Sequence, residues 1–339
     1  MKKFWIAICF LLGLGGAIAA PLQDLSSAPV GRIEFWSSTP EHRWRLANPK
    51  TSGQNPVVIW GDLLMPPNAG GKVPAVIVHH GSEGVTSLYY DVWAPAFLKA
   101  GYAVFIVDSQ KPRGVERQLG NLQLSWNTVG NISDVLHSLK ILATHPRIDA
   151  SRIFNIGFSR GASAVLQAVW PFYQRALLPD DLHFAGSVAV YPGCNIRYRA
   201  DHWGTNPGPL LLLLAEKDNM TPAQPCVEYA ELLHSAGNDV SAKVYPGAYH
   251  VFDRLDQRFS RNWEGTFADC SLTIKMTIRQ GDPFEAFDHK TGVQFSSSQQ
   301  WNEAIRQCGR EKQISVESNP RAREQAVKDV LQFIDRRGL

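Results

Sequence analysis

The sequence predicts an α/β protein whose mostly parallel sheet is covered by helices on both faces. Continuous apolar runs of strand length alternate along the chain with segments whose apolar residues recur at helical spacing. Strands that are apolar throughout are typical of a sheet with no face open to water. The 339 residues are 44% hydrophobic and 19% charged, which indicates a globular chain with a substantial core.

The expected strands begin after residue 55 and continue to residue 245. Their expected bounds are 57–65, 75–79, 102–108, 152–156, 187–191, 210–214 and 242–245. Helices are expected at 94–99, 128–143, from 162, 223–236 and 321–337. The helix at 128–143 has a clear pattern, because its apolar residues fall on one face at spacings of three and four.

Residues 1–20 have the three parts of a secretory signal peptide. Two lysines precede an apolar run from Phe4 to Leu14, and cleavage is expected after Ala19 or Ala20. The run is short for a membrane span, and an uncleaved anchor is the alternative. Residues 21–55 are rich in Pro, Ser and Asn and predict an extended N-terminal segment before the main domain at 56–339.

The net charge gives no sign of a polyanionic partner. It is +3, and two of the positive charges, Lys2 and Lys3, lie in the expected signal peptide. The remaining balance does not indicate binding to nucleic acid or to an anionic membrane. We therefore expect an exported protein, periplasmic or extracellular, that is not stably inserted in a membrane once the signal is cleaved.

The pentapeptide at 157–161, Gly-Phe-Ser-Arg-Gly, separates the strand at 152–156 from a helix rich in small residues. It fits the G-x-S-x-G pattern, in which a serine occupies a sharp turn between a strand and a helix. Glycines permit the tight backbone of such a turn, and the helix N-terminus directs amide groups at the reacting atoms. A Gly/Ser-rich turn without function is the alternative, but the downstream residues favour Ser159 as a nucleophile.

A serine nucleophile needs a base that removes its proton and a carboxylate that orients the base. Asp218 follows the apolar strand at 210–214, and His250 follows the strand at 242–245. Both therefore lie beyond the carboxyl ends of strands, where open α/β sheets bind their ligands, and the order serine, acid, histidine is that of α/β-hydrolases. Glu216 is the alternative acid, nearer to its strand.

The tetrahedral intermediate of acyl transfer needs hydrogen-bond donors for its oxyanion. We expect one donor to be the backbone amide of Arg160 and the other to come from the loop after the strand at 75–79. In that loop the amide of Ser82 is favoured and that of Gly81 is the alternative. The two histidines that precede this loop are adjacent, so they point to opposite faces of a strand and do not indicate a metal site. No metal or organic cofactor is expected.

These residues resemble the dienelactone hydrolase family of the α/β-hydrolase superfamily, in an exported branch with a serine nucleophile. The resemblance rests on His80-Gly81, Gly157-x-Ser159-x-Gly161, Asp218 and His250-x-Phe252, and it covers about residues 55–253 and the last helix. It implies the α/β-hydrolase fold and hydrolysis of esters. The chain departs from the family's pattern in two ways: the founding members look to have cysteine as nucleophile where this chain has Ser159, and the compact members lack the insertion before the last helix.

That insertion spans 254–320. Alternation of apolar Leu272, Ile274, Met276 and Ile278 with polar residues predicts a half-buried strand, and residues 301–307 look helical. A segment of this size has too little core to be rigid alone, so a disulfide is expected to staple it.

Cys9 lies in the expected signal peptide, which leaves four cysteines and three possible pairings. Their placement favours Cys194–Cys226 and Cys270–Cys308, the second of which would fasten the insertion onto itself. The resemblance to exported relatives supports both pairs, because those relatives look similar around all four positions.

The sequence thus predicts a serine esterase that cleaves carboxylic esters of small molecules through an acyl-enzyme. A peptidase of the prolyl peptidase type has the same order of catalytic residues, although residues 20–55 are too few for a propeller domain. An inactive relative that binds a ligand through the insertion is a further alternative. Arg113, which follows a strand end, either binds a substrate carboxylate or forms a structural salt bridge, and the salt bridge is favoured.

Overall fold

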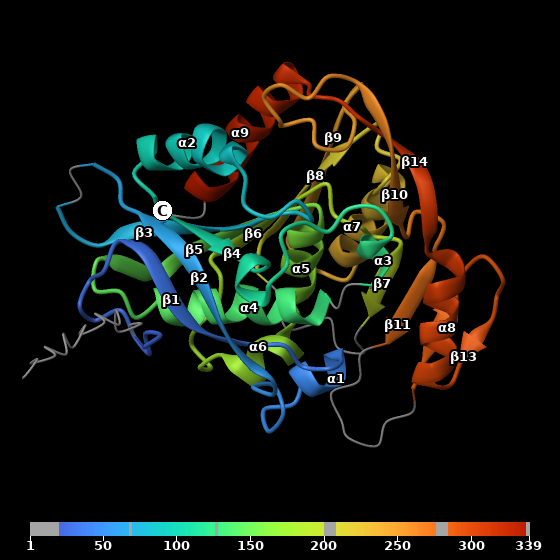
Figure 1. Ribbon diagram of the computed structural model, residues 1–339, viewed down its shortest axis with the longest axis horizontal. Coiled ribbons are helices and arrows are strands. Elements are labelled where there is room, and N and C mark those ends of the chain that lie inside the picture. Colours follow the sequence, from blue (N-terminus) through green and yellow to red (C-terminus); the bar gives the residue numbers. More distant parts are fainter. Residues whose placement is uncertain (1–19, 68–69, 126–127, 200–207, 276–283, 337–339) are drawn as a thin grey trace, which may run out of the picture.

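Figure 1 shows the computed structural model, which describes residues 20–67, 70–125, 128–199, 208–275 and 284–336. Residues 1–19 of the expected signal peptide lie outside these ranges. Within the described part of the chain, no helix has both the length and the apolar character to cross a membrane.

The central sheet has eight strands in the order β1-β2-β4-β3-β5-β6-β8-β9. Their bounds are β1 Gly31–Ser38, β2 Pro56–Leu64, β3 Val73–His79, β4 Ala103–Asp108, β5 Ile148–Phe158, β6 Gly186–Val190, β8 Leu210–Ala215 and β9 Val240–Tyr245. Every pair from β4 to β9 is parallel, whereas β2 is antiparallel to both of its neighbours. The sheet is therefore mostly parallel, as the apolar strands predicted.

Helices cover both faces of this sheet (Figure 1). One apolar core lies under α4 Thr128–Leu142, α5 Arg160–Ala168, α6 Pro171–Leu177 and α7 Ala223–Ser235. A second core lies under the π-helical turn η1 Tyr89–Trp93, α2 Ala94–Lys99 and α9 Pro320–Asp335. Neighbouring residues of β3 point to opposite faces, so Ile77 joins the first core while Val76 and Val78 join the second. This is the α/β-hydrolase fold.

The N-terminal segment contributes a strand to the central sheet. Within residues 21–55, which were expected to form an extended segment, β1 pairs along its length with β2 and forms an edge of the sheet. Ile33 and Phe35 are buried in the first core, which explains why this strand is held there. A short helix, α1 Arg43–Leu46, follows it and buries Leu46.

The insertion is not a separate unit. Its strands and helix are β10 Ser260–Thr266, β11 Leu272–Lys275, β12 Ala286–Asp288, β13 Gln294–Phe295, α8 Ser298–Cys308 and β14 Arg310–Val316. We call the antiparallel pair β10–β14 the ribbon. The other strands form a sheet in the order β13-β12-β11-β7, and β7 Ile196–Arg199 precedes the insertion in the chain. The insertion is stapled by its own disulfide, as expected, and it is also joined to the main domain because β7 and β11 form a parallel pair. Met276 and Ile278 of the expected strand lie outside the described residues.

Both disulfides are those expected. Cys194 bonds to Cys226 and Cys270 bonds to Cys308, with 5.0 Å between the Cα atoms in each pair. The second bridge follows β10 and precedes β14, so it closes one end of the ribbon.

Candidate active site

The turn that carries Ser159 is strained and tightly packed. Ser159 has φ 50° and ψ −113°, outside the conformations that serine ordinarily adopts, and it joins β5 to α5. A Cβ atom at Gly157 would lie 2.3 Å from the Gly161 carbonyl oxygen. One at Gly161 would lie 2.4 Å from the His79 carbonyl oxygen. Glycine is therefore required on both sides of the serine by close backbone contacts.

His250 reaches this serine from the loop after β9. Its Nε2 lies 3.1 Å from Ser159 Oγ, and its Nδ1 lies 2.7 Å from Asp218 Oδ2. His250 is 91 residues from Ser159 and 32 residues from Asp218 along the chain, and all three side chains are buried. The line through them allows His250 to receive the serine proton on Nε2 while Nδ1–H donates to the carboxylate.

Asp218 is held in place by its own loop. Its Oδ1 accepts hydrogen bonds from the amides of Met220 and Thr221 at 2.8 and 2.9 Å, and its Oδ2 accepts from Thr221 Oγ1 at 2.9 Å. The alternative acid, Glu216, is exposed and instead accepts a bond from the Gly247 amide at 2.6 Å. The structure thus brings Asp218, and not Glu216, to the histidine.

The loop after β3 approaches the serine closely, and its orientation is fixed by several hydrogen bonds. The Gly81 amide donates to Tyr89 Oη at 3.1 Å, and its carbonyl accepts from His80 Nδ1 at 2.7 Å. Burial lowers the pKa of His80, which favours the neutral ring with its proton on Nδ1, since Nε2 accepts from the Ser109 amide. Because the Gly81 amide is already engaged, the Ser82 amide is the better candidate for an oxyanion donor.

The side chain after the nucleophile reinforces this loop. Arg160 Nε donates to Ser82 Oγ at 3.0 Å, and its Nη2 donates to the Gln123 carbonyl at 3.0 Å. Ser82 Oγ in turn donates to Gln123 Oε1 at 2.9 Å. Burial lowers the pKa of Arg160 to about 10, so the guanidinium stays charged at neutral pH.

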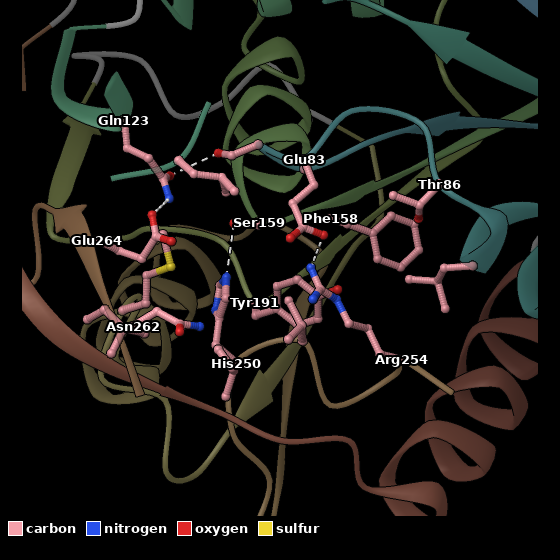
Figure 2. Close-up of a pocket in the computed structure, with 18 of the residues that line it drawn as sticks. Glu83, Thr86, Gln123, Phe158, Ser159, Tyr191, His250, Arg254, Asn262 and Glu264 are labelled. Atoms are coloured by element: carbon pink, nitrogen blue, oxygen red, sulfur yellow. Dashed lines mark hydrogen bonds and ion pairs between the residues drawn. The ribbon is translucent and has the colours of Figure 1, made fainter. Parts of the chain in front are cut away.

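Two cavities meet at Ser159. The smaller, of about 90 Å³, borders His250 and is shown in Figure 2. The larger, of about 290 Å³, extends along α5 on the side of Arg160. In Figure 2 an ion pair between Glu83 and Arg254 lies in the smaller cavity, and Gln123 donates to Glu264 at 2.8 Å across it. Glu264 belongs to β10, so the ribbon covers the site.

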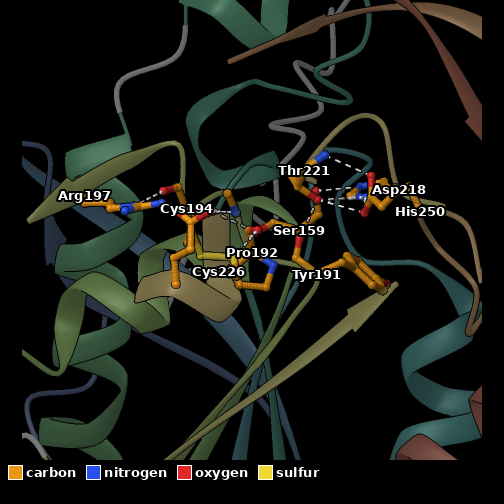
Figure 3. The surroundings of a disulfide bond; sticks show 12 residues. Ser159, Tyr191, Pro192, Cys194, Arg197, Asp218, Thr221, Cys226 and His250 are labelled. Carbon is orange, nitrogen blue, oxygen red and sulfur yellow. Dashed lines mark hydrogen bonds and ion pairs between the residues drawn. A yellow bond between two sulfur atoms is a disulfide. The ribbon is translucent and has the colours of Figure 1, made fainter. Parts of the chain in front are cut away.

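Sequence reasoning missed the groups that support the histidine. Thr221 Oγ1 lies 3.2 Å from His250 Nδ1 and donates to Asp218, as Figure 3 shows. The ring of Tyr191, a residue with φ 43°, lies against the imidazole with 4.8 Å between centroids. Its hydroxyl donates at 2.7 Å to Asp253, whose pKa is raised by burial. Thr221 stands three residues after Asp218, and the tendency of aspartate to bond the next few amides was a signal that could have found it.

Arg113 is a structural residue. Its guanidinium makes two bonds of 2.8 Å to the carboxylate of Asp134, which is fully buried. Arg113 is not among the described residues that line either cavity at Ser159.

The sheet topology, the strained serine turn and the approach of a histidine from the loop after β9 define an α/β-hydrolase. The model of the dienelactone hydrolase family matches residues 59–271, and the chain belongs to this family. It is accordingly a hydrolase of the serine type. No curated protein matches the chain.

Several solved structures resemble the chain at low identity. A candidate dienelactone hydrolase from Klebsiella pneumoniae subsp. pneumoniae MGH 78578 is 20% identical over 66% of this chain and 88% of that one, with a TM-score of 0.47. Esterase 2 of Thermogutta terrifontis, phosphorylated by paraoxon, is 15% identical over 58% and 80%, with a TM-score of 0.43. Dipeptidyl peptidase 4 of Porphyromonas gingivalis is 16% identical over 59% and 31%, also at 0.43. Identities this low carry no information about the substrate.

Proposed function

We propose that this protein is an exported esterase that hydrolyses carboxylic esters of small molecules through an acyl-enzyme on Ser159. One observation carries the proposal: three side chains from separate loops lie in hydrogen-bonding contact. His250 Nε2 lies 3.1 Å from Ser159 Oγ, and His250 Nδ1 lies 2.7 Å from Asp218 Oδ2. A buried serine bonded to a histidine that is itself bonded to a carboxylate has the geometry of an activated nucleophile.

In the acylation step Ser159 Oγ attacks the ester carbonyl as His250 Nε2 takes its proton. The negative charge that develops on the carbonyl oxygen is stabilised by the amides of Arg160 and Ser82. The C–O bond then breaks, and His250 returns the proton to the departing alcohol. Asp218 accepts the Nδ1–H of the imidazole throughout and stabilises its charged form.

In the deacylation step water takes the place of the alcohol. His250 removes a proton from the water, whose oxygen attacks the acyl-enzyme carbonyl. Collapse of the second tetrahedral intermediate releases the acid and returns the proton to Ser159. Every proton transfer uses His250 Nε2, so loss of this group blocks both steps.

Export rests on the N-terminal pattern of the sequence and is supported by the two disulfides, which are typical of oxidising compartments.

Ser159→Ala is expected to remove nearly all turnover of short 4-nitrophenyl esters, with a loss of about 10³-fold or more in kcat, because the acyl-enzyme cannot form. The measurement is initial rate with the purified mature protein, together with labelling by a fluorophosphonate. Ser151→Ala is the matched control, since Ser151 lies on β5, the strand that leads to Ser159, is exposed, and its hydroxyl donates to the neighbouring Asp149 at 2.6 Å. Labelling that persists in Ser159→Ala would show that another residue is the nucleophile.

A further inference from the structure

One polar atom in the wall of the larger cavity at Ser159 has no partner. Gln167 is only 9% exposed, and its Oε1 is buried without a hydrogen bond to any described residue. Among the described residues that line this cavity, Gln167 is the only one with such an atom. A buried acceptor without a donor is costly, and a bound molecule that supplies the donor relieves that cost.

Two other polar side chains of the same wall are already bonded within the protein. Ser163 Oγ accepts from the Gly193 amide at 3.0 Å. Asn195 Nδ2 donates to two backbone carbonyls of the insertion, at 3.0 and 3.1 Å. Gln167 differs from both, because the fold leaves its carbonyl oxygen for a ligand.

Within the cavity, Gln167 lies well away from the serine. It belongs to α5 and shares a face of that helix with Arg160 and Ser163, which also line the cavity. From Arg160 to Gln167 the helix rises by about two turns, or roughly 10 Å. A ligand group that reaches Gln167 is therefore separated from the reacting carbonyl by a spacer of several atoms.

The position of His250 indicates which part of an ester extends toward Gln167. His250 lines the smaller cavity, and it is not among the described residues that line the larger one. The departing alcohol receives its proton from His250 Nε2, so it leaves through the smaller cavity. The acyl group, which stays bonded to Ser159 Oγ, then extends along α5 into the larger cavity.

The rest of the lining limits the chemistry of that acyl group. The guanidinium groups of Arg43 and Arg160 line the cavity, so a cationic donor such as an ammonium group is disfavoured there. A hydroxyl is a compact neutral donor. Much of the remaining wall is apolar and suits an apolar spacer, since it includes Leu124, Val129, Ile196, Phe267 and Ile305.

We infer that the preferred substrates are esters of hydroxylated acids, in which an apolar acyl group ends in a hydroxyl that donates to Gln167 Oε1. The inference rests on the proposed esterase function and adds the substrate class. A site that hydrogen-bonds a substrate hydroxyl discriminates against an analogue without it, because the analogue leaves the protein group unpaired. An acid such as 3-(4-hydroxyphenyl)propanoic acid has this form, with an apolar ring between the carbonyl and the hydroxyl.

The first test compares two 4-nitrophenyl esters of nearly the same shape. One is the ester of 3-(4-hydroxyphenyl)propanoic acid, and in the other a methyl group replaces the ring hydroxyl. With the purified mature protein, kcat/KM is expected to be at least about tenfold higher for the hydroxyl ester, because the methyl ester leaves Gln167 Oε1 buried and unpaired. Equal values, or a higher value for the methyl ester, would overturn the inference and leave the esterase function intact.

Gln167→Met removes the acceptor and keeps the length of the side chain. We expect the ratio of kcat/KM between the two esters to fall to about one, mainly through a loss on the hydroxyl ester. Gln224→Met is the matched control, because it makes the same change at an exposed position of α7 that does not line the cavity, and it should keep the ratio of the natural chain. A loss by the same factor on both esters in Gln167→Met would contradict a hydroxyl site.

Binding separates this inference from the esterase function. The probes are two ketones that carry the same chains without a leaving group, 4-(4-hydroxyphenyl)butan-2-one and 4-(4-methylphenyl)butan-2-one. In calorimetry with Ser159→Ala, the hydroxyl ketone is expected to have a Kd at least about tenfold lower, and the added Gln167→Met change should remove the difference. If neither ester is hydrolysed, the esterase function fails, and ketone binding alone then decides whether the hydroxyl site exists. Equal Kd values in Ser159→Ala, or a difference that persists without Gln167, would refute it.

Discussion

Single side chains around His250 show how the site stabilises one orientation of the imidazole. Thr221 contacts three groups with one hydroxyl: it donates to Asp218, lies 3.2 Å from His250 Nδ1, and lies 3.1 Å from the Tyr191 carbonyl. Since Asp218 also accepts the Thr221 amide, the acid and its neighbour form one compact turn. Thr221 is thus a positioning residue that acts through Asp218.

Thr221→Val is expected to lower kcat by about tenfold while leaving KM nearly unchanged, because it removes a hydrogen bond to a carboxylate in the relay but keeps the volume of the side chain. Steady-state kinetics on a neutral 4-nitrophenyl ester provides the measurement. Thr221→Ser keeps the hydroxyl and should retain most of the activity. A purely structural role would be indicated if the serine variant lost as much kcat as the valine variant.

Among the elements, the Cys194–Cys226 bridge connects the loop after β6 with α7, next to the loop of Asp218 (Figure 3). Both sulfur atoms belong to buried residues, with Cys226 Sγ 3.3 Å from the Pro192 carbonyl. The bridge therefore holds the loop that carries Tyr191 close to the helix that follows the acid.

Replacing both cysteines, as Cys194→Ser with Cys226→Ser, is expected to lower the free energy of unfolding by about 3–4 kcal/mol, the chain-entropy value for a loop closed over a separation of 32 residues. Urea unfolding of the double variant and the natural chain, both without reductant, measures it. The double variant Cys270→Ser with Cys308→Ser serves as the comparison, because it removes the other disulfide, whose separation of 38 residues gives a loop of almost equal length. An unchanged midpoint for the first pair would contradict a stabilising bridge at this place.

The elements also show what the sequence could and could not predict. Seven of the eight strands of the central sheet were predicted, because most of them are apolar along their length, and Ser159, Asp218 and His250 were chosen because each follows one of these strands. The parallel pairing of β7 with β11 was not, since the two strands are short and Ile196 meets Leu272 far along the chain. In β1 the alternation of buried Ile33 and Phe35 with polar residues was a usable signal that the surrounding Pro and Ser obscured.

Two further contacts could not be predicted, because each joins residues that are far apart in the sequence. Arg43 lies outside the segment that resembles the family, and only its contact with Tyr198 places it in the cavity beside the serine. Likewise Asn219 accepts from the Ser315 amide at 2.9 Å and donates to the Gln313 carbonyl at 3.0 Å, which ties the acid loop to β14 of the ribbon. No local pattern encodes such contacts.

At the scale of the whole molecule, buried histidines couple stability to pH. His79 ends β3, is 4% exposed, and its Nε2 has no hydrogen-bond partner within the described residues. Burial lowers its pKa from 6.5 to about 3, an effect that the nearby Asp134 opposes and His80 reinforces. The folded protein therefore holds this ring neutral at pH values at which the unfolded chain protonates it.

The sign of the effect follows from the lowered pKa. The contribution of His79 to stability is complete above about pH 6.5 and is lost as the pH falls, by about 1.4 kcal/mol per unit, until the folded pKa is reached. His79→Leu removes the titrating group, so the free energy of unfolding should fall less steeply on acidification, by a difference of about 2 kcal/mol between about pH 7.5 and pH 5. Urea unfolding at a series of pH values measures both slopes. His183→Gln, at an exposed position, should leave the slope of the natural chain unchanged. Parallel curves for His79→Leu and the natural chain would show that this ring is not held neutral by the fold.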